Sequence, residues 1–130
     1  MFQKEIKMDF QYRQNTRTFF IDIDGTLLKH RDNIHEIITT YGSLVDGVIK
    51  QLIEIRKMGH YIVLTTARPE GTRHYTEKEL ERLGIFYDQL IMGLPIGPRI
   101  IINDTNTDRP MAIGITIERD GGFNIEEHLK

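Results

Sequence analysis

Two aspartates and a threonine stand together in the segment Asp22-Ile23-Asp24-Gly25-Thr26. Side chains alternate between the two faces of a strand, so Asp22 and Asp24 are expected on one side of the chain. Two carboxylates held that close repel each other, and a hard divalent cation such as Mg²⁺ relieves the repulsion. Gly25 permits a sharp exit from a strand, and the Thr26 hydroxyl can orient a carboxylate or a phosphate. A solvated Asp-Gly turn has the same composition, so this segment alone leaves both interpretations open.

The elements that must position these residues can be predicted from the apolar pattern. Runs rich in β-branched and aromatic residues predict strands at 18–23, 61–64, 89–92, 99–102 and 112–117. Helical spacing predicts helices at 44–58, at 76–83, where Thr76 to Glu79 has the form of a capping box, and near 124–130. Alternating strands and helices predict an α/β fold, namely a three-layer α/β/α, Rossmann-like domain with a central, mainly parallel sheet.

Polar clusters follow three of the predicted strands directly. They are Asp22 to Thr26, Thr65 to Arg68 and Asn103 to Asp108. Ligands of parallel α/β sheets bind at the carboxyl ends of the strands. The three clusters are therefore expected along one edge of the sheet.

The bulk composition narrows the class of protein. The chain has 130 residues and a formal net charge of −2, which predicts one domain over 1–130 with a core at about 17–120 and no general attraction to nucleic acid. It has no cysteine, so disulfides, thiolate metal sites and cysteine nucleophiles are excluded. No apolar run reaches the roughly 20 residues that span a bilayer, so a cytoplasmic protein without a membrane segment is expected.

From about Thr18 to Asp108 the sequence resembles the haloacid dehalogenase superfamily of phosphohydrolases. The first motif of that superfamily, a strand followed by Asp-x-Asp-x-Thr, stands here as DIDGT. The resemblance implies a Mg²⁺-dependent phosphatase, a phosphoric monoester hydrolase in which Asp22 is the nucleophile and forms an aspartyl-phosphate. Asp24 would protonate the leaving oxygen and then activate water, and its main-chain carbonyl would bind the metal.

Two more motifs of the family have counterparts here. The second motif, a strand ending in Thr or Ser, corresponds to Ile62 to Pro69. The resemblance implies that Thr66, or otherwise Thr65, binds the transferring phosphoryl group. Arg68 would steady the site or the substrate. The acidic metal-binding motif corresponds to Ile100 to Asp108. The resemblance thus implies four metal ligands, which are Asp22, Asp24, Asp104 and Asp108.

The third motif departs from the family pattern. Many small relatives have a lysine in a Gly-Lys-Pro turn, and this chain has Gly93-Leu94-Pro95. A transferring phosphoryl group needs several positive partners, so another cation is expected to replace the lysine. Arg99 is the first candidate, followed by Arg73 and Lys78.

No stretch is long enough for the cap domain that many relatives carry. The segment between Leu28 and Leu44 suffices only for a flap at 29–41, whose basic residues Lys29, His30, Arg31 and His35 are expected to face an anionic ligand. Residues 87–122 resemble small phosphatases of capsule or surface polysaccharide biosynthesis, which favours a sugar phosphate as substrate. A phosphatase of nucleic-acid ends or of a phosphoprotein, and a non-catalytic Mg²⁺-binding interaction module, are the alternatives. Assembly into a homo-oligomer is left open.

Overall fold

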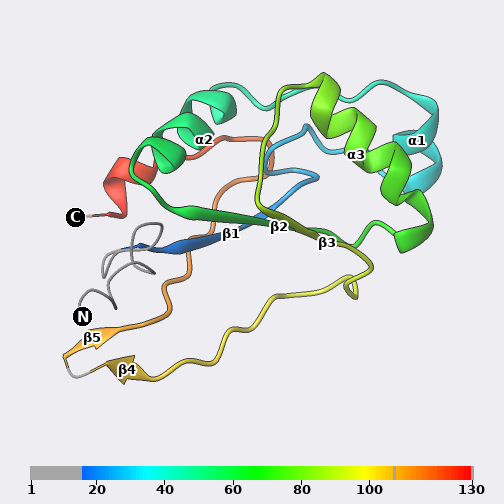
Figure 1. Cartoon of the computed structure of the whole chain (residues 1–130). Coiled ribbons are helices and arrows are strands. Elements are labelled where there is room, and N and C mark those ends of the chain that lie inside the picture. Colours follow the sequence, from blue (N-terminus) through cyan, green and yellow to red (C-terminus); the bar gives the residue numbers. More distant parts are fainter. Residues whose placement is uncertain (1–15, 107, 130) are drawn as a thin grey trace, which may run out of the picture.

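The computed structural model describes residues 16–106 and 108–129. Figure 1 shows a small sheet, helices above it and a long excursion of extended chain below it. The elements in chain order are β1 (Thr18–Asp22), α1 (Ile34–Thr39), α2 (Val48–Lys57), β2 (Tyr61–Thr65), the 3-10 helix η2 (Glu70–Thr72), α3 (Arg73–Arg82), β3 (Gln89–Ile91), β4 (Thr105–Asn106), β5 (Arg109–Pro110) and the 3-10 helix η3 (Ile125–Glu127).

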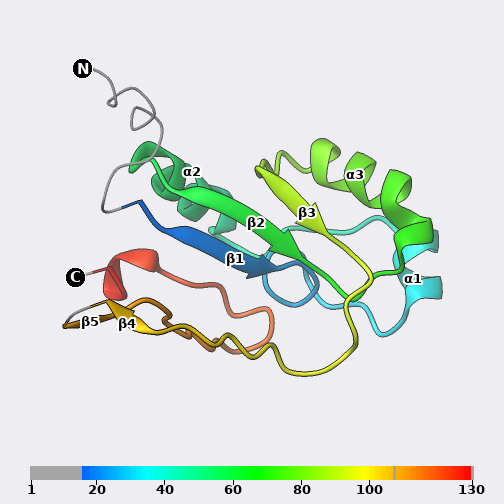
Figure 2. The same ribbon diagram turned by 60° about the horizontal axis from the view of Figure 1, so that its bottom comes forward.

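The three longer strands form a parallel sheet in the order β1-β2-β3. Asp22 pairs in register with Thr65, and Thr65 pairs with Ile91, so the carboxyl ends of the three strands are level with one another. Figure 2 shows these ends meeting at one edge of the sheet. The predicted α/β class and the parallel sheet are confirmed, and no cap domain interrupts the described chain.

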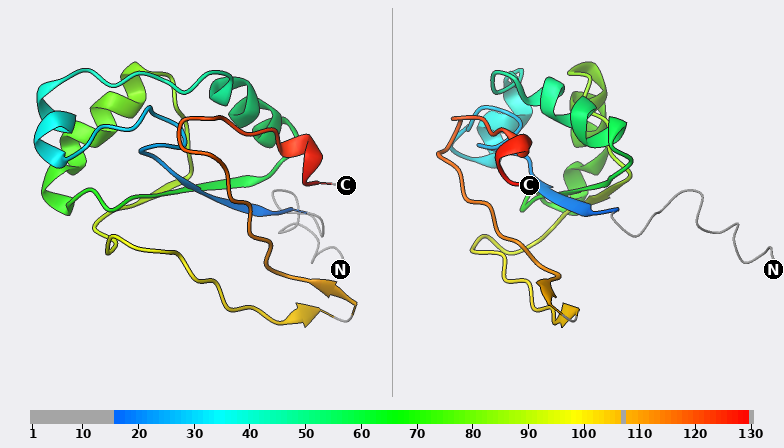
Figure 3. Two further views of the ribbon diagram at one scale, coloured as in Figure 1. Left: turned by 180° about the vertical axis from the view of Figure 1, so that it is seen from behind. Right: turned by 90° about the vertical axis from the view of Figure 1, so that its left-hand side faces the viewer.

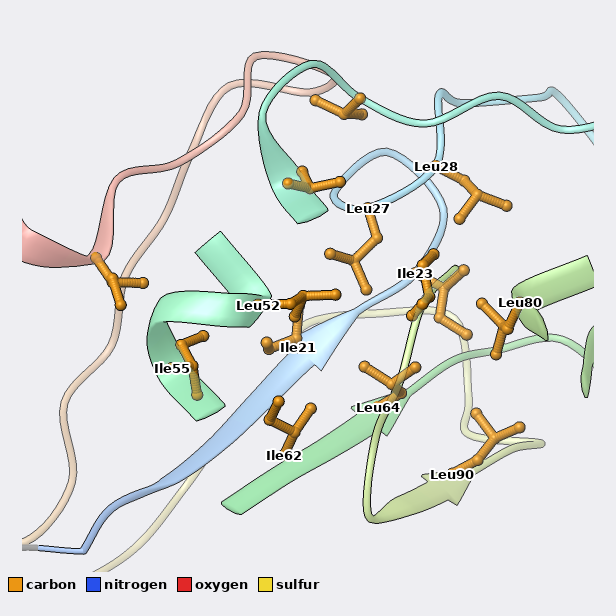
Figure 4. Packing of buried hydrophobic residues seen from close by; sticks show 14 of the residues in the cluster. Ile21, Ile23, Leu27, Leu28, Leu52, Ile55, Ile62, Leu64, Leu80 and Leu90 are labelled. Atoms are coloured by element: carbon orange, nitrogen blue, oxygen red, sulfur yellow. The ribbon is translucent and has the colours of Figure 1, made fainter. Parts of the chain in front are cut away.

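The core lies between the sheet and the helices. Leu52 and Ile55 of α2 and Leu80 of α3 are fully buried against Ile62 and Leu64 of β2 (Figure 4). Burying apolar side chains of this size stabilises the fold by about 1.5–3 kcal/mol for each residue. The face of the sheet that packs against the helices is therefore fixed by the hydrophobic side chains of all three strands.

The chain from 94 to 118, which we call the arm, lies on the other side of the sheet, and the antiparallel β4–β5 hairpin is at its midpoint, farthest from the helices (Figure 3). No helix covers that side within residues 16–106 and 108–129. The strands predicted at 99–102 and 112–117 are absent, and Ile96 and Ile102 are 94% and 92% exposed. Isoleucine favours a strand only where a neighbouring strand accepts its hydrogen bonds, and among the described residues neither segment has such a neighbour.

The first long helix begins later than predicted. Residues 43–45 instead pair with 27–29, through bonds from the Lys29 N–H to the Ser43 carbonyl and from the Val45 N–H to the Leu27 carbonyl, both at 2.9 Å. Gly47 then takes a φ of 83° before α2 starts, a conformation that favours glycine. Within the described residues, no helix has the length and apolar character needed to cross a membrane.

Candidate active site

The chain turns sharply after Asp22, at the carboxyl end of β1. The N–H groups of Leu27 and Leu28 both bond to the Ile23 carbonyl, at 2.9 and 3.0 Å, which closes a tight loop. Gly25 has a φ of 91° in this loop, where a side chain would be strained. The loop thus presents the two aspartates at the edge where the strands end.

Asp22 is half-buried at this edge, with a side chain that is 46% exposed. The Thr26 hydroxyl donates a 3.2 Å hydrogen bond to its Oδ2. Burial raises the pKa of Asp22 above its usual value, and the charge of Asp24 raises it further, against the lowering effects of the Thr26 bond and of Arg99. The ionised carboxylate is therefore short of positive partners and suited to attract one.

Asp24 is held by a buried arginine. Arg68 donates from Nε to Asp24 Oδ2 at 2.9 Å and from Nη2 to Oδ1 at 2.8 Å, a bidentate contact. Its other contacts are the Thr76 hydroxyl at 3.2 Å and Glu79 Oε1 at 2.9 Å, and its side chain is 2% exposed. The guanidinium thus faces Asp24, Thr76 and Glu79 instead of solvent, a position that fits the expected role of steadying the site better than that of binding substrate.

The two threonines at the end of β2 point in opposite directions. Thr65 pairs in register with Asp22 and therefore shares its face of the sheet, where it is partly exposed. Thr66 is 2% exposed, and its hydroxyl accepts a 3.0 Å hydrogen bond from the Arg68 N–H. The structure thus brings Thr65 beside Asp22 and turns Thr66, the first choice from sequence, toward the interior.

Of the three cations considered in place of the missing lysine, Arg99 lies at Asp22. Its Nη2 is 3.9 Å from Asp22 Oδ1. Arg73 instead pairs with Glu70 at 2.9 Å and with Glu77 at 3.4 Å, and hydrogen bonding to Glu70 is the main cause of its raised pKa. Lys78 is exposed on α3.

The two carboxylates of the predicted acidic motif lie elsewhere. Asp104 directly precedes β4 and Asp108 directly precedes β5, and that hairpin lies near the amino end of β1 rather than its carboxyl end (Figures 1 and 2). In the part of the chain that the structure describes, no group of three or more His, Cys, Asp or Glu residues could hold a metal ion. The predicted set of four ligands is not assembled, because residues 99–102 do not form a strand beside β1.

Several residues of the site were missed or misjudged from sequence. Helix α3 begins at Arg73, so Thr76 and Glu79 are not a capping box but buried helical residues, at 0% and 3% exposure. Arg31 of the flap is also buried, and it faces Glu79 instead of a ligand. The burial of Glu79 could have been inferred from its position next to Leu80 on the apolar face of a helix. A carboxylate buried there needs a cationic partner.

The segment 118–122 also returns to the loop after β1. The Asp120 N–H donates to the Gly25 carbonyl at 2.8 Å, and Asp120 Oδ1 accepts from the His30 N–H at 2.8 Å. Arg119 lies over Gly25, where an added Cβ would be 3.4 Å from its Cγ. Nothing in the local sequence indicated this contact.

A parallel sheet whose first strand ends in paired aspartates is the arrangement of an α/β enzyme that handles a ligand at its strand ends. The family model of haloacid dehalogenase-like hydrolases matches residues 19–88, more than half of the chain. The chain therefore belongs to the haloacid dehalogenase-like hydrolases. The match includes β1 to α3 and stops before the arm.

Two curated proteins are each similar to about half of the chain. A D-glycero-β-D-manno-heptose-1,7-bisphosphate 7-phosphatase from Photorhabdus laumondii is 35% identical over 66 residues, which are 51% of this chain and 34% of that protein. The enzyme of that name from Haemophilus influenzae is 36% identical over 63 residues, 48% of this chain and 33% of its own. The similarity thus spans about a third of the length of these curated relatives.

One solved structure is similar in fold. The structure of a Pnkp1/Rnl/Hen1 complex contains a chain that is 26% identical, with a TM-score of 0.53. The superposition covers 68% of this chain and 32% of the other.

Proposed function

We propose that this protein is a Mg²⁺-dependent phosphatase that hydrolyses a phosphate monoester through Asp22. One observation carries the proposal: Asp22 stands at the strand ends beside Asp24, with the Thr26 hydroxyl on one oxygen and Arg99 near the other. Membership of the hydrolase family supports the same reaction class.

In the first step, an Asp22 carboxylate oxygen bonds to phosphorus and the bond from phosphorus to the ester oxygen breaks. For this step one Asp24 oxygen is protonated and released from its Arg68 donor, because both oxygens accept from Arg68 in the structure, and Asp24 then gives the departing oxygen that proton. In the second step, Asp24 takes a proton from water, the water oxygen attacks phosphorus, and the bond to Asp22 breaks. The products are an alcohol and inorganic phosphate, and both carboxyl groups return to their starting state.

The remaining residues bind and orient. We assign the binding of the phosphoryl group to the Thr65 hydroxyl, because Thr65 shares the face of Asp22; the sequence favoured Thr66, which is buried. Arg99, whose Nη2 is 3.9 Å from Asp22, would offset the charge on the phosphoryl oxygens. Arg68 fixes the orientation of the Asp24 carboxylate through its two hydrogen bonds.

The donors at the strand ends suit Mg²⁺, which is commonly bound by one or two carboxylates together with substrate phosphate and water. The Asp22 carboxylate, whose raised pKa reflects burial and the nearby Asp24 charge, and the Asp24 carbonyl would hold the ion. Bound there, Mg²⁺ would neutralise phosphate charge. Asp104 and Asp108 remain proposed ligands only if the arm can bring them to this edge.

A phosphorylated sugar is the substrate class that we favour. Both curated relatives described above are named as phosphatases of a heptose bisphosphate, and each is similar to about half of this chain. Nucleic-acid ends and phosphoproteins are the alternative substrates, because no cap domain in the described chain restricts access of a macromolecule to Asp22.

The test is phosphate release from a panel of sugar phosphates, nucleotides, phosphorylated oligonucleotides and phosphopeptides, with Mg²⁺ or with a chelator. We expect Mg²⁺-dependent release that Asp22→Asn lowers by several orders of magnitude. Asp46→Asn, a change at an exposed aspartate before α2, is the matched control and should leave the rate unchanged. Release by Asp22→Asn at the wild-type rate would refute the mechanism, and no release from any ester would favour a non-catalytic Mg²⁺-binding module.

A further inference from the structure

Four charged side chains form a continuous chain of ion pairs from the site to the flap. In order they are Asp24, Arg68, Glu79 and Arg31, which we call the charge relay. Arg68 Nη2 is 2.9 Å from Glu79 Oε1, and Arg31 Nη2 is 3.1 and 3.0 Å from the two Glu79 oxygens. The charges alternate in sign, and Glu79 at the centre has a side chain that is only 2% exposed.

The outer end of the charge relay fastens the flap. Arg31 Nη1 donates to the carbonyls of Ile37 and Thr40, at 3.1 and 3.2 Å, at the end of α1. The Tyr75 hydroxyl lies 2.7 and 3.1 Å from the same two carbonyl oxygens, which share its one proton. The flap is therefore attached to α3 where α3 also holds Arg68.

Stability alone does not account for this arrangement. Burying charged groups costs desolvation, and well-packed apolar residues in their place often give equal or greater stability. Among the described residues, Arg31 Nε is moreover buried without a hydrogen-bond partner, which adds to the cost. What the charges provide beyond apolar packing is a fixed direction for each side chain, and the chain of contacts ends on the Asp24 carboxylate.

We propose that Glu79 and Arg31 are positioning residues that fix the Asp24 carboxylate through Arg68 and thereby couple the flap to the site. This inference rests on the proposed function for its kinetic consequence. Glu79 orients the Arg68 guanidinium, and Arg68 orients Asp24 by its bidentate contact. A movement of the flap acts on Asp24 through the same contacts.

The first test is the steady-state kinetics of Glu79→Gln on the best ester of the panel. This change keeps the side-chain shape but removes the charge that holds Arg68. We expect kcat to fall about 10- to 100-fold, the effect of a small displacement of a reacting group, while KM changes less than about threefold. Leu52→Ala, which opens a cavity in the core under α2 and changes no charged group, is the control for lost stability and should keep kcat.

The second test needs no activity. Hydrogen exchange of backbone amides should rise at least about tenfold in Glu79→Gln both at 31–42 and in the loop 22–28, whereas Leu52→Ala should not single out these segments. If the wild type releases no phosphate, the proposed function fails while this test still decides the coupling. Should Glu79→Gln not fold, Arg31→Lys replaces it, because an ammonium group cannot reproduce the planar fork of contacts. Wild-type exchange in the loop 22–28, or a kcat equal to that of Leu52→Ala, would overturn the inference.

Discussion

Gly42→Ala would place a methyl group against the centre of the charge relay. A Cβ on Gly42 would lie 2.6 Å from Glu79 Oε2, 2.8 Å from Arg31 Nη2 and 3.1 Å from Leu28 Cδ2. Both polar atoms end long side chains, which ordinarily yield to a clash. Here they bond to each other at 3.0 Å, and the Gly42 N–H also donates to Glu79 Oε2 at 3.1 Å. Neither atom can move away without breaking a buried ion pair.

The expected loss of stability follows from these contacts. Breaking a buried ion pair costs about 3–5 kcal/mol, and forcing an extra methyl into a packed interior costs about 1–3 kcal/mol. Partial displacement of the pair should lie between these limits, so we expect the unfolding free energy to fall by about 2–4 kcal/mol. For a domain of this size, 1 kcal/mol corresponds to roughly 3–5 °C, so Tm should fall by about 6–20 °C.

Thermal and urea unfolding followed by circular dichroism measure this loss. Gly71→Ala is the matched control, because a Cβ on Gly71 meets no atom within 4 Å. Gly71→Ala should leave Tm nearly unchanged. If Gly42→Ala and Gly71→Ala unfold at the same temperature, the contacts around Glu79 are not packed as described.

Three further outcomes are expected. Burial and the charge of Asp24 raise the pKa of Asp22, so the ionised carboxylate destabilises the folded state at pH 7. Asp22→Asn should therefore abolish phosphate release yet raise the unfolding free energy, by less than about 1 kcal/mol because the side chain is 46% exposed. A lower unfolding free energy of Asp22→Asn in urea would contradict this. Burial, and then the charge of Arg17, lowers the pKa of His60 below its ordinary 6.5. The unfolding free energy should therefore fall as the pH drops below about 6.5 and level off below the folded-state pKa, and His60→Gln should remove that slope, which Tm at successive pH values tests. Arg99→Gln should lower kcat/KM about tenfold because it removes a positive charge 3.9 Å from the nucleophile, whereas Arg109→Gln on β5 should not, and equal rates would exclude Arg99 from the site.

The sheet could be predicted because its strands carry local signals. Strands predicted at 18–23, 61–64 and 89–92 correspond to β1, β2 and β3 within two residues at each end. Buried parallel strands have near-continuous apolar runs, which a local pattern detects. The arm has equally apolar runs, but whether a strand forms there depends on a hydrogen-bonding neighbour, and no local pattern reports one.

The site was predictable to the extent that its residues are close in sequence. The spacing of Asp22, Asp24 and Thr26 within one loop indicated the paired carboxylates directly. The pair of Arg31 and Glu79 joins residues 48 positions apart, and that contact is set by how α3 packs against the flap. The spacing of Thr76 and Glu79 also fits a helix cap, and only the start of α3 at 73 separates the two interpretations.

The arm leaves the domain and returns to it at the same place. At its start, the N–H groups of Leu94 and of the preceding Gly93 bond to the carbonyls of Thr66 and Arg68, at 3.2 and 2.8 Å. Just after its end, the Asp120 N–H bonds to the Gly25 carbonyl at 2.8 Å. Because the entropy of closing such a loop grows slowly with its length, residues added between β4 and β5 should cost little. A nick there would leave two fragments, each fastened to the site by its own hydrogen bonds. The turn of the hairpin is thus a natural position for a tag, a protease site or a split into two complementing chains.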